Sequence, residues 1–293
     1  MSTILPSLFR EVDGIVYERE RLTTPDDDFL DLDWIYKNND RIVVVFHGLE
    51  GSSDRHYVKG LAKMLSQQDY TVLAVNSRSC SGEMNRAPRL YHHADVADVA
   101  LVLDHVLSKG YTIINLVGFS MGGAMVLNYL ADQAEAVPDK INSAVAISSP
   151  VDLGGSAREL EQPGNSFYLN RFLKKLKSKI HFKAEQYPQL IDLTGIEDIQ
   201  LFSELDDRYT APLHGFKDSD DFYEQASVLS RLQHISIPSL LLIAENDPFM
   251  PSSCYPYAEA ESSDMFFLEV PKRGGHVGFP RRGIKLSLIH ISE

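Results

Sequence analysis

The chain has 293 residues, of which 44% are hydrophobic and 24% charged, the balance of a globular protein that buries a sizeable core. Its formal net charge of −13 argues against nucleic acid as a partner, because a phosphate backbone binds a basic surface. With only two cysteines, Cys80 and Cys254, the composition argues against a disulfide framework. The start does not resemble a signal peptide and no apolar run is long enough for a membrane span, so we expect a cytoplasmic protein.

Apolar patterns along the first half of the chain predict alternating strands and helices. Strands are expected at residues 14–21, 29–36, 41–46, 71–75, 113–117 and 141–147, the first two antiparallel, and helices at 57–67, 95–107 and 124–130. Such alternation is typical of an α/β protein with a mostly parallel central sheet and helices on both faces.

The loop after the strand at 41–46 has the sequence of a backbone donor site. It reads His47-Gly48-Leu49-Glu50-Gly51. In enzymes of one fold, such a loop and the residue after a nucleophilic serine each donate a backbone N–H to a developing oxyanion. Here these donors would be Leu49 and Met121, which follows the candidate nucleophile Ser120. The alternative for His47 is a general base or a metal ligand, although no second ligand lies at the spacing of a metal site.

A candidate nucleophile follows the strand at 113–117. Ser120 lies in Gly118-Phe119-Ser120-Met121-Gly122, directly before a helical pattern. In a G-x-S-x-G elbow the tight turn projects the serine hydroxyl above the sheet edge, and glycines allow strand and helix to pack closely. The alternative is an ordinary glycine-rich turn, since small residues beside a serine are common in loops.

Two partners for this serine follow in a defined order. Asp247 comes after a strand predicted at 239–244, and His276 lies in the loop after a strand predicted at 265–270. The order Ser, Asp, His is that of the α/β-hydrolase fold. Because the ends of parallel strands meet at one edge of the sheet, we expect the three side chains within hydrogen-bond reach.

Residues 150–234 interrupt the alternation with helical patterns and many charges. We expect a helical lid here, inserted into a core made of residues 1–149 and 235–285. One segment forms a basic amphipathic helix, with the cations Arg171, Lys174, Lys175, Lys177, Lys179 and Lys183 interleaved with Leu169, Phe172, Leu173, Leu176 and Ile180. A solvated face on a packed helix is the favoured interpretation, and contact with an anionic membrane surface is the alternative.

Five motifs together resemble the YheT-like family of α/β-hydrolases, the AB hydrolase 4 type of serine esterases. They are His47–Ser53, 76–83, the elbow at 118–123, 244–249 and 274–279, and the resemblance spans residues 42–279. It implies a cofactor-independent hydrolase of carboxylic esters, short-chain or acyl-lipid, that acts through an acyl-enzyme. Ser120 would be the nucleophile, His276 the base, and Asp247 the residue that orients His276. Neither a metal nor a cofactor is required.

The chain departs from the family's pattern in two places. Tyr91-His92-His93-Ala94 stands where Tyr-His-Ser-Gly is expected, and Ser77-Arg78-Ser79 where Phe-Arg-Gly is usual. Both changes are expected to alter loop packing near the pocket. For His92 and His93, a surface or packing role is favoured over an approach to the pocket.

Other activities remain open at this point. The same residues would cut thioesters or amides, and the fold also serves as a non-catalytic binding module. The segment 286–293, Leu-Ser-Leu-Ile-His-Ile-Ser-Glu, resembles a translated sequencing adaptor, so we expect the natural sequence to depart near Lys285; a genuine apolar tail is the alternative. Substrate identity and oligomeric state do not follow from the sequence.

Overall fold

The computed structural model describes residues 11–279. The segment 286–293 and the expected end of the natural sequence near Lys285 therefore lie outside the described residues.

Eight strands form one sheet in the order β1-β2-β4-β3-β5-β6-β7-β8. Strand β1 pairs antiparallel with β2, and β2 with β4, whereas all other neighbours are parallel. The strands are β1 (Glu18–Thr23), β2 (Phe29–Ile35), β3 (Arg41–Phe46), β4 (Thr71–Asn76), β5 (Ile113–Phe119), β6 (Ile141–Ile147), β7 (Ser239–Leu242) and β8 (Phe266–Glu269). The predicted mostly parallel sheet is confirmed.

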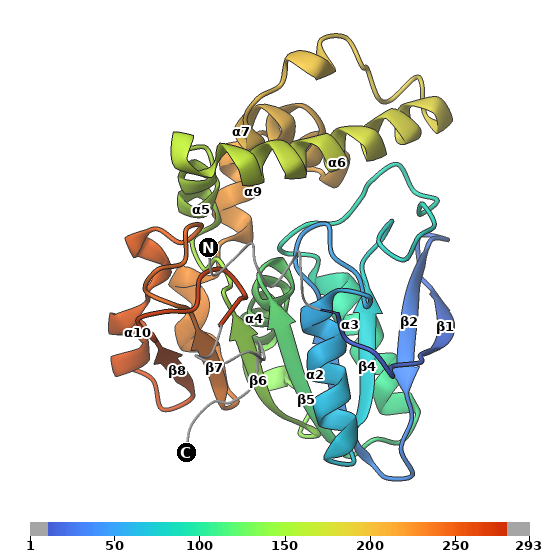
Figure 1. Ribbon diagram of the computed structural model, residues 1–293, viewed down its shortest axis with the longest axis vertical. Helices are drawn as coiled ribbons and strands as arrows, with labels where there is room; N and C mark the ends of the chain where they lie inside the picture. Colours follow the sequence, from blue (N-terminus) through green and yellow to red (C-terminus); the bar gives the residue numbers. More distant parts are fainter. Residues whose placement is uncertain (1–10, 280–293) are drawn as a thin grey trace.

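Helices cover both faces of the sheet (Figure 1). Helix α2 (His56–Gln67) packs on the face that carries Val43 and Val45, while α3 (Val96–Ser108) and α4 (Met121–Gln133) share a core with Val44 and Leu116 on the other face. Because successive side chains of a strand point to opposite faces, the continuous Ile-Val-Val-Val run of β3 supplies both cores.

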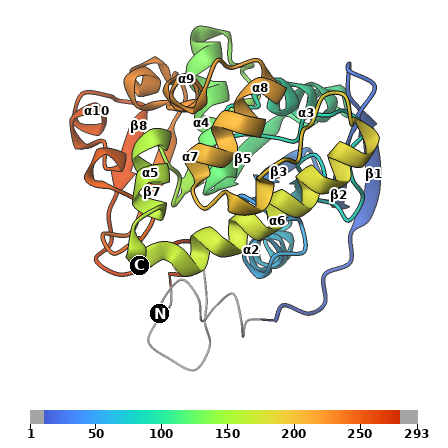
Figure 2. The same cartoon turned by 90° about the horizontal axis from the view of Figure 1, so that it is seen from above.

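Helices also fill the chain between β6 and β7. They are α5 (Leu153–Leu160), α6 (Ser166–Gln186), α7 (Phe202–Leu205), α8 (Ala211–His214) and α9 (Ser219–Ala226), with a π-helical turn at Asp206–Thr210 and short 3-10 turns at Pro163–Asn165, Ile196–Asp198 and Leu229–His234. Figure 2 shows α5, α6, α7 and α8 spread over the sheet as seen from above. Further 3-10 turns at Ala134–Ala136 and Ser252–Cys254 and helix α10 (Tyr257–Glu261) complete the described elements.

Helix α6 has the predicted amphipathic character. Leu169, Leu173, Leu176 and Ile180 are buried at spacings of three and four residues, and they form a second apolar core with α7 and the 3-10 turn at Ile196–Asp198. The helical segment thus has a core of its own above the strand ends.

The largest differences between a predicted and an observed first residue of an element occur at β1 and at the elbow helix. β1 begins at Glu18 and not at residue 14, because Glu18 pairs with Trp34, next to the end of β2. The elbow helix begins at Met121 and not at residue 124. Gly122 and Gly123 already belong to the helix, where Gly122 lies against the backbone after β3 and Gly123 lies against Ser149. No described helix combines the length and apolar character needed to cross a bilayer.

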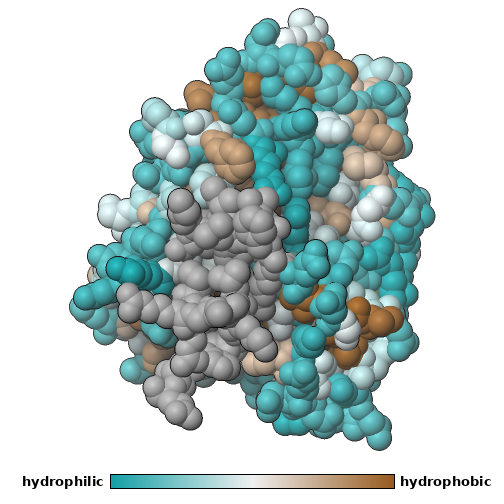
Figure 3. Space-filling model, viewed as in Figure 1, coloured by the Kyte–Doolittle hydropathy of each residue, from teal (hydrophilic) through white to brown (hydrophobic). Residues whose placement is uncertain are grey.

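Outside the grey residues, the surface in Figure 3 is mostly hydrophilic, with hydrophobic residues gathered in small patches. This agrees with the acidic composition of the chain.

Candidate active site

Ser120 sits in a strained turn between β5 and α4. Its backbone has φ 53° and ψ −120°, outside the regions that a serine normally occupies. The turn is held by a hydrogen bond of 2.8 Å from the Ser120 N–H to the Ile147 carbonyl. Gly122 is required by the close approach of helix and sheet, because any side chain there would collide with the backbone carbonyls of Phe46 and His47.

The structure brings the three predicted side chains together. His276 Nε2 lies 3.0 Å from Ser120 Oγ, and His276 Nδ1 lies 3.0 Å from Asp247 Oδ2. The Asp247 side chain is completely buried, and that of His276 is 10% exposed. Since a carboxylate only accepts, this pairing favours the tautomer with the proton on Nδ1, which leaves Nε2 as an acceptor facing the serine hydroxyl.

Two residues that the sequence analysis missed hold the histidine loop in place. Asn246 Oδ1 accepts hydrogen bonds from the N–H groups of Gly274 and Gly275 at 2.9 and 3.0 Å. Ser148 Oγ accepts one from the Val277 N–H at 3.0 Å. The sequence marks these two residues only by their positions, since Asn246 precedes Asp247 and Ser148 directly follows β6.

The predicted donor loop lies against the elbow. A Cβ atom on Gly48 would lie 3.1 Å from the Ser120 Cβ, so this glycine allows the loop to approach the serine. Within residues 11–279, the backbone N–H groups of Leu49 and Met121 donate no hydrogen bond to protein. Both donors are thus unused next to the Ser120 hydroxyl.

A buried ion pair ties this loop to α6. Tyr91 Oη accepts a hydrogen bond from the Glu50 N–H at 2.9 Å and donates to Glu50 Oε1 at 2.7 Å. Lys179 Nζ donates to the same carboxylate oxygen at 2.7 Å, and its side chain is 14% exposed. The partners are 129 residues apart in sequence, so no local pattern could reveal the contact.

His47 serves the loop as a buried neutral ring. Its Nδ1 lies 2.7 Å from the Gly48 carbonyl, and its Nε2 accepts a hydrogen bond from the Ser77 N–H at 3.1 Å. Burial lowers the pKa of His47 to about 4. Both ring nitrogens are therefore occupied, which argues against the alternative roles as general base or metal ligand. Among residues 11–279, no group of three His, Cys, Asp or Glu side chains is placed to hold a metal ion.

Two pockets meet at Ser120. They share Leu49, Ser120, Phe172, Phe249 and His276. The deep pocket extends under the helical segment and, with the open solvent at its mouth included, holds about 1050 Å³ of empty space. Its apolar walls include Leu153, Leu160, Leu176, Ile180, Phe202 and Leu213.

The second, cationic pocket has a different lining. Arg55, Arg171 and Lys175 line it, and its one carboxylate, Glu50, is already engaged by Lys179. Burial, followed by the charge of Arg55, lowers the pKa of Lys175. Positive charge is therefore concentrated on this side of Ser120, in a chain that is acidic overall.

His92 and His93 do not lie at the surface. Both line the deep pocket, where His92 packs edge-on against Phe222 with ring centroids 5.6 Å apart. Burial lowers the pKa of His93 to about 3, so its ring is neutral. His92 therefore has the packing role that the sequence analysis favoured, and both histidines also approach the pocket, which was the alternative.

Comparison with known proteins places this site in a family. Residues 41–281 match the model of the alpha/beta hydrolase fold family. The Escherichia coli K12 protein named "Putative esterase YheT" is 32% identical over 95% of this chain and 83% of its own length. The mouse protein named phospholipase ABHD3 is 29% identical over 94% of this chain and 70% of its own length.

Among solved structures, an esterase of Pyrococcus furiosus superposes with a TM-score of 0.59 at 20% identity, covering 92% of this chain and 90% of that one. At this identity the likeness supports the fold alone. The family-model match and the similarity to the E. coli protein together show that the chain is a member of the YheT-like family of α/β-hydrolases.

Proposed function

We propose that the protein is a serine hydrolase that cleaves carboxylic esters through an acyl-enzyme. The observation that carries this proposal is the hydrogen-bonded series from Ser120 Oγ through His276 to Asp247, with distances of 3.0 Å at both ends. The names of the relatives, esterase and phospholipase, support ester bonds over thioesters and amides as the substrates.

In the proposed reaction His276 Nε2 takes the proton of the Ser120 hydroxyl as its oxygen attacks the ester carbonyl. Asp247 holds the Nδ1 proton and stabilises the imidazolium without accepting that proton. The N–H groups of Leu49 and Met121 would stabilise the oxyanion, because they have no other partner among the described residues. His276 then protonates the departing alcohol, and water, activated by the same ring, hydrolyses the acyl-enzyme.

The two pockets suggest an orientation for the substrate. We assign the acyl group to the deep pocket, since its walls are mostly apolar. The alcohol part of the ester is assigned to the cationic pocket, where positively charged side chains would bind a polar group. The helices between β6 and β7 would act as a lid, because they form one wall of the deep pocket. The free thiols Cys80 and Cys254 are consistent with a cytoplasmic location.

Replacement of the nucleophile tests the proposal. We expect Ser120→Ala to reduce kcat for p-nitrophenyl butyrate about 10⁶-fold, as the loss of the catalytic serine does in a serine protease. Its thermal unfolding should stay that of the wild type. Ser262→Ala, which changes an exposed serine after α10, is the matched control and should retain full activity. Retention of more than a few per cent of turnover by Ser120→Ala would reject the assignment.

A further inference from the structure

One part of the deep pocket is polar. The helical segment contributes Asp206, Thr210, His214 and Tyr223, and the loop before α3 contributes His92 and His93. A pocket that only held an alkyl chain would be apolar throughout, because a buried polar group without a partner is costly. None of these side chains takes part in the proposed reaction.

Hydrogen bonds within this polar cluster leave some groups satisfied and others free. Tyr223 Oη donates to Asp206 Oδ2 at 2.8 Å, and Thr210 also donates to this carboxylate. His214 Nδ1 lies 2.7 Å from the Thr210 carbonyl. Because a carbonyl only accepts, Nδ1 carries the proton and Nε2 is a lone-pair acceptor.

The groups without a partner belong to residues that line the deep pocket. His214 Nε2 is buried and has no hydrogen-bond partner within residues 11–279. The His93 ring makes no hydrogen bond in the same part of the chain, and as a neutral imidazole it offers one donor and one acceptor. A ligand group that both donates and accepts would satisfy these atoms.

The charges around the cluster select a neutral ligand group. A carboxylate would lie near Asp206 and would have no proton to offer to His214 Nε2. A cation would meet the ammonium of Lys183, which lines the same pocket and is held by the Ala87 carbonyl at 2.6 Å. A hydroxyl group has the required donor, acceptor and charge.

The cluster is remote from the nucleophile. Asn128 Nδ2 donates to the His93 carbonyl at 3.3 Å, and Asn128 follows Ser120 by eight positions along α4. Because Asn128 Nδ2 also donates to the Ala124 carbonyl at 3.0 Å, the His93 backbone lies between one and two turns of α4 beyond Ser120. None of the cluster side chains lines the second pocket, so the cluster is placed to meet a group along the acyl chain and not the ester itself.

We propose that the deep pocket selects acyl groups that carry a hydroxyl group several carbons from the ester carbonyl, through hydrogen bonds to His214 and His93. This inference rests on the proposed function, since it assigns the acyl group to the deep pocket. It adds a substrate class, hydroxylated medium-chain acyl esters, and two specificity residues.

A substrate series with the unmodified protein tests it directly. Medium-chain p-nitrophenyl esters of one length are compared, with the hydroxyl group moved from the sixth carbon to the chain end, because hydroxyl groups at the fourth and fifth carbons form lactones without an enzyme. We expect at least one position to raise kcat/KM about tenfold or more over the unsubstituted ester, because sites built to bond a hydroxyl discriminate strongly against its absence. If no position is favoured over the unsubstituted chain, the inference is overturned.

Variants then test the two histidines. His214→Phe and His93→Phe should each reduce the preference for the hydroxylated ester at least about threefold, with much smaller effects on the unsubstituted ester. His181→Phe, on α6 and outside both pockets, is the matched control and should keep the wild-type preference. A preference that persists unchanged in both pocket variants would contradict the assignment.

Failure of the proposed function gives a different result. In that case no ester of the series, hydroxylated or not, is hydrolysed, and Ser120→Ala behaves as the wild type. Hydrolysis of all esters without discrimination overturns the hydroxyl inference alone.

Discussion

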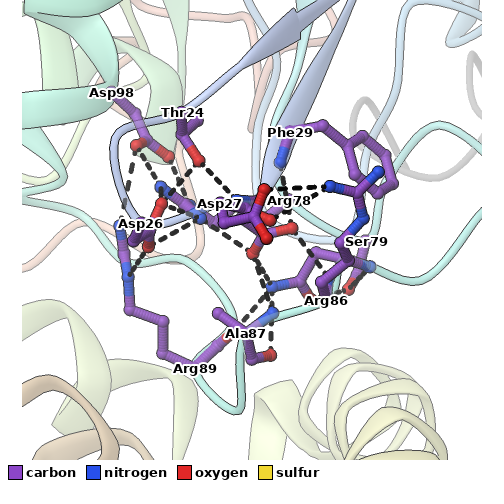
Figure 4. A network of polar contacts seen from close by, with 12 residues as sticks. Thr24, Asp26, Asp27, Phe29, Arg78, Ser79, Arg86, Ala87, Arg89 and Asp98 are labelled. Carbon is purple, nitrogen blue, oxygen red and sulfur yellow. Dashed lines mark hydrogen bonds and ion pairs between the residues drawn. The ribbon is translucent and has the colours of Figure 1, made fainter.

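Two clusters of buried charged side chains within residues 11–279 differ in how far their polar groups are engaged. The first surrounds Arg78, whose side chain is 1% exposed and bonds to Asp26, Asp28 and Asp98 (Figure 4). The second comprises Asp247 and His276 beside Ser120. Burial and ion pairing are common to both, so these properties alone do not indicate a catalytic site.

The difference lies in what remains unsatisfied. In the Arg78 cluster, Asp28 also accepts hydrogen bonds from Asn85 Nδ2 at 2.6 Å and from the Arg86 N–H at 2.7 Å. Burial alone would raise the pKa of Asp28, but these bonds and Arg78 outweigh it and lower the pKa. Around Ser120, by contrast, two N–H donors are free, and two pockets adjoin the hydroxyl. A closed network stabilises the fold, whereas an open one is able to act on a ligand.

After replacement of Ser120, the largest effect is expected from the carboxylate of the open cluster. We expect Asp247→Asn to lower kcat about 10⁴-fold, because an amide favours the wrong histidine tautomer, as in the serine proteases. Steady-state hydrolysis of p-nitrophenyl butyrate measures this. Asp264→Asn changes an exposed residue and serves as the control. Activity of Asp247→Asn within tenfold of the wild type would remove Asp247 from the mechanism.

The closed cluster should respond in stability instead. Arg78→Met leaves the buried Asp28 without its cation and Asp98 with only the longer contact to Arg89 at 3.6 Å, and it should lower the free energy of unfolding by about 3–5 kcal/mol. Urea-induced unfolding measures this change, and kcat per folded molecule should stay near the wild-type value. Arg86→Met removes an exposed arginine of the same loop and should change stability little. Equal stability of Arg78→Met and the wild type would contradict a structural role for Arg78.

The free energy of unfolding should depend on pH through the buried, neutral His93. An unfolded histidine takes up a proton as the pH falls below about 6.5, whereas folded His93, with a pKa of about 3, does not. The contribution of His93 to stability is thus complete above that pH and is lost as the pH falls toward the folded pKa. In urea unfolding between about pH 6 and pH 5, the loss of stability per pH unit should be about 1 kcal/mol smaller in His93→Ser than in the wild type. Equal slopes would show that folded His93 is protonated.

The sequence predicted the parts of the protein that local patterns encode. Strands β3 and β6 have the predicted bounds, since short segments rich in apolar residues define them. The elbow and the order Ser120, Asp247, His276 predicted three side chains at one sheet edge, and the structure brings them within hydrogen-bond distance. Chain order was sufficient because parallel strands end at a common edge.

Local sequence patterns do not predict which residues line the pockets. Glu50 meets Lys179, and His93 joins a cluster with His214, through contacts between loops and helices distant in sequence. No periodicity links these residues, and the packing of the helical segment decides which side chains meet. This is why His93 was expected at the surface or in packing, although it lines the deep pocket.

Covalent labelling of the serine tests the central claim most directly. A fluorophosphonate probe followed by peptide mass spectrometry reports which hydroxyl is activated in the folded protein. The account predicts one adduct per chain, on Ser120, and strongly slowed labelling in Asp247→Asn. An adduct on a different residue, or ester hydrolysis that continues while Ser120 is fully modified, would contradict it.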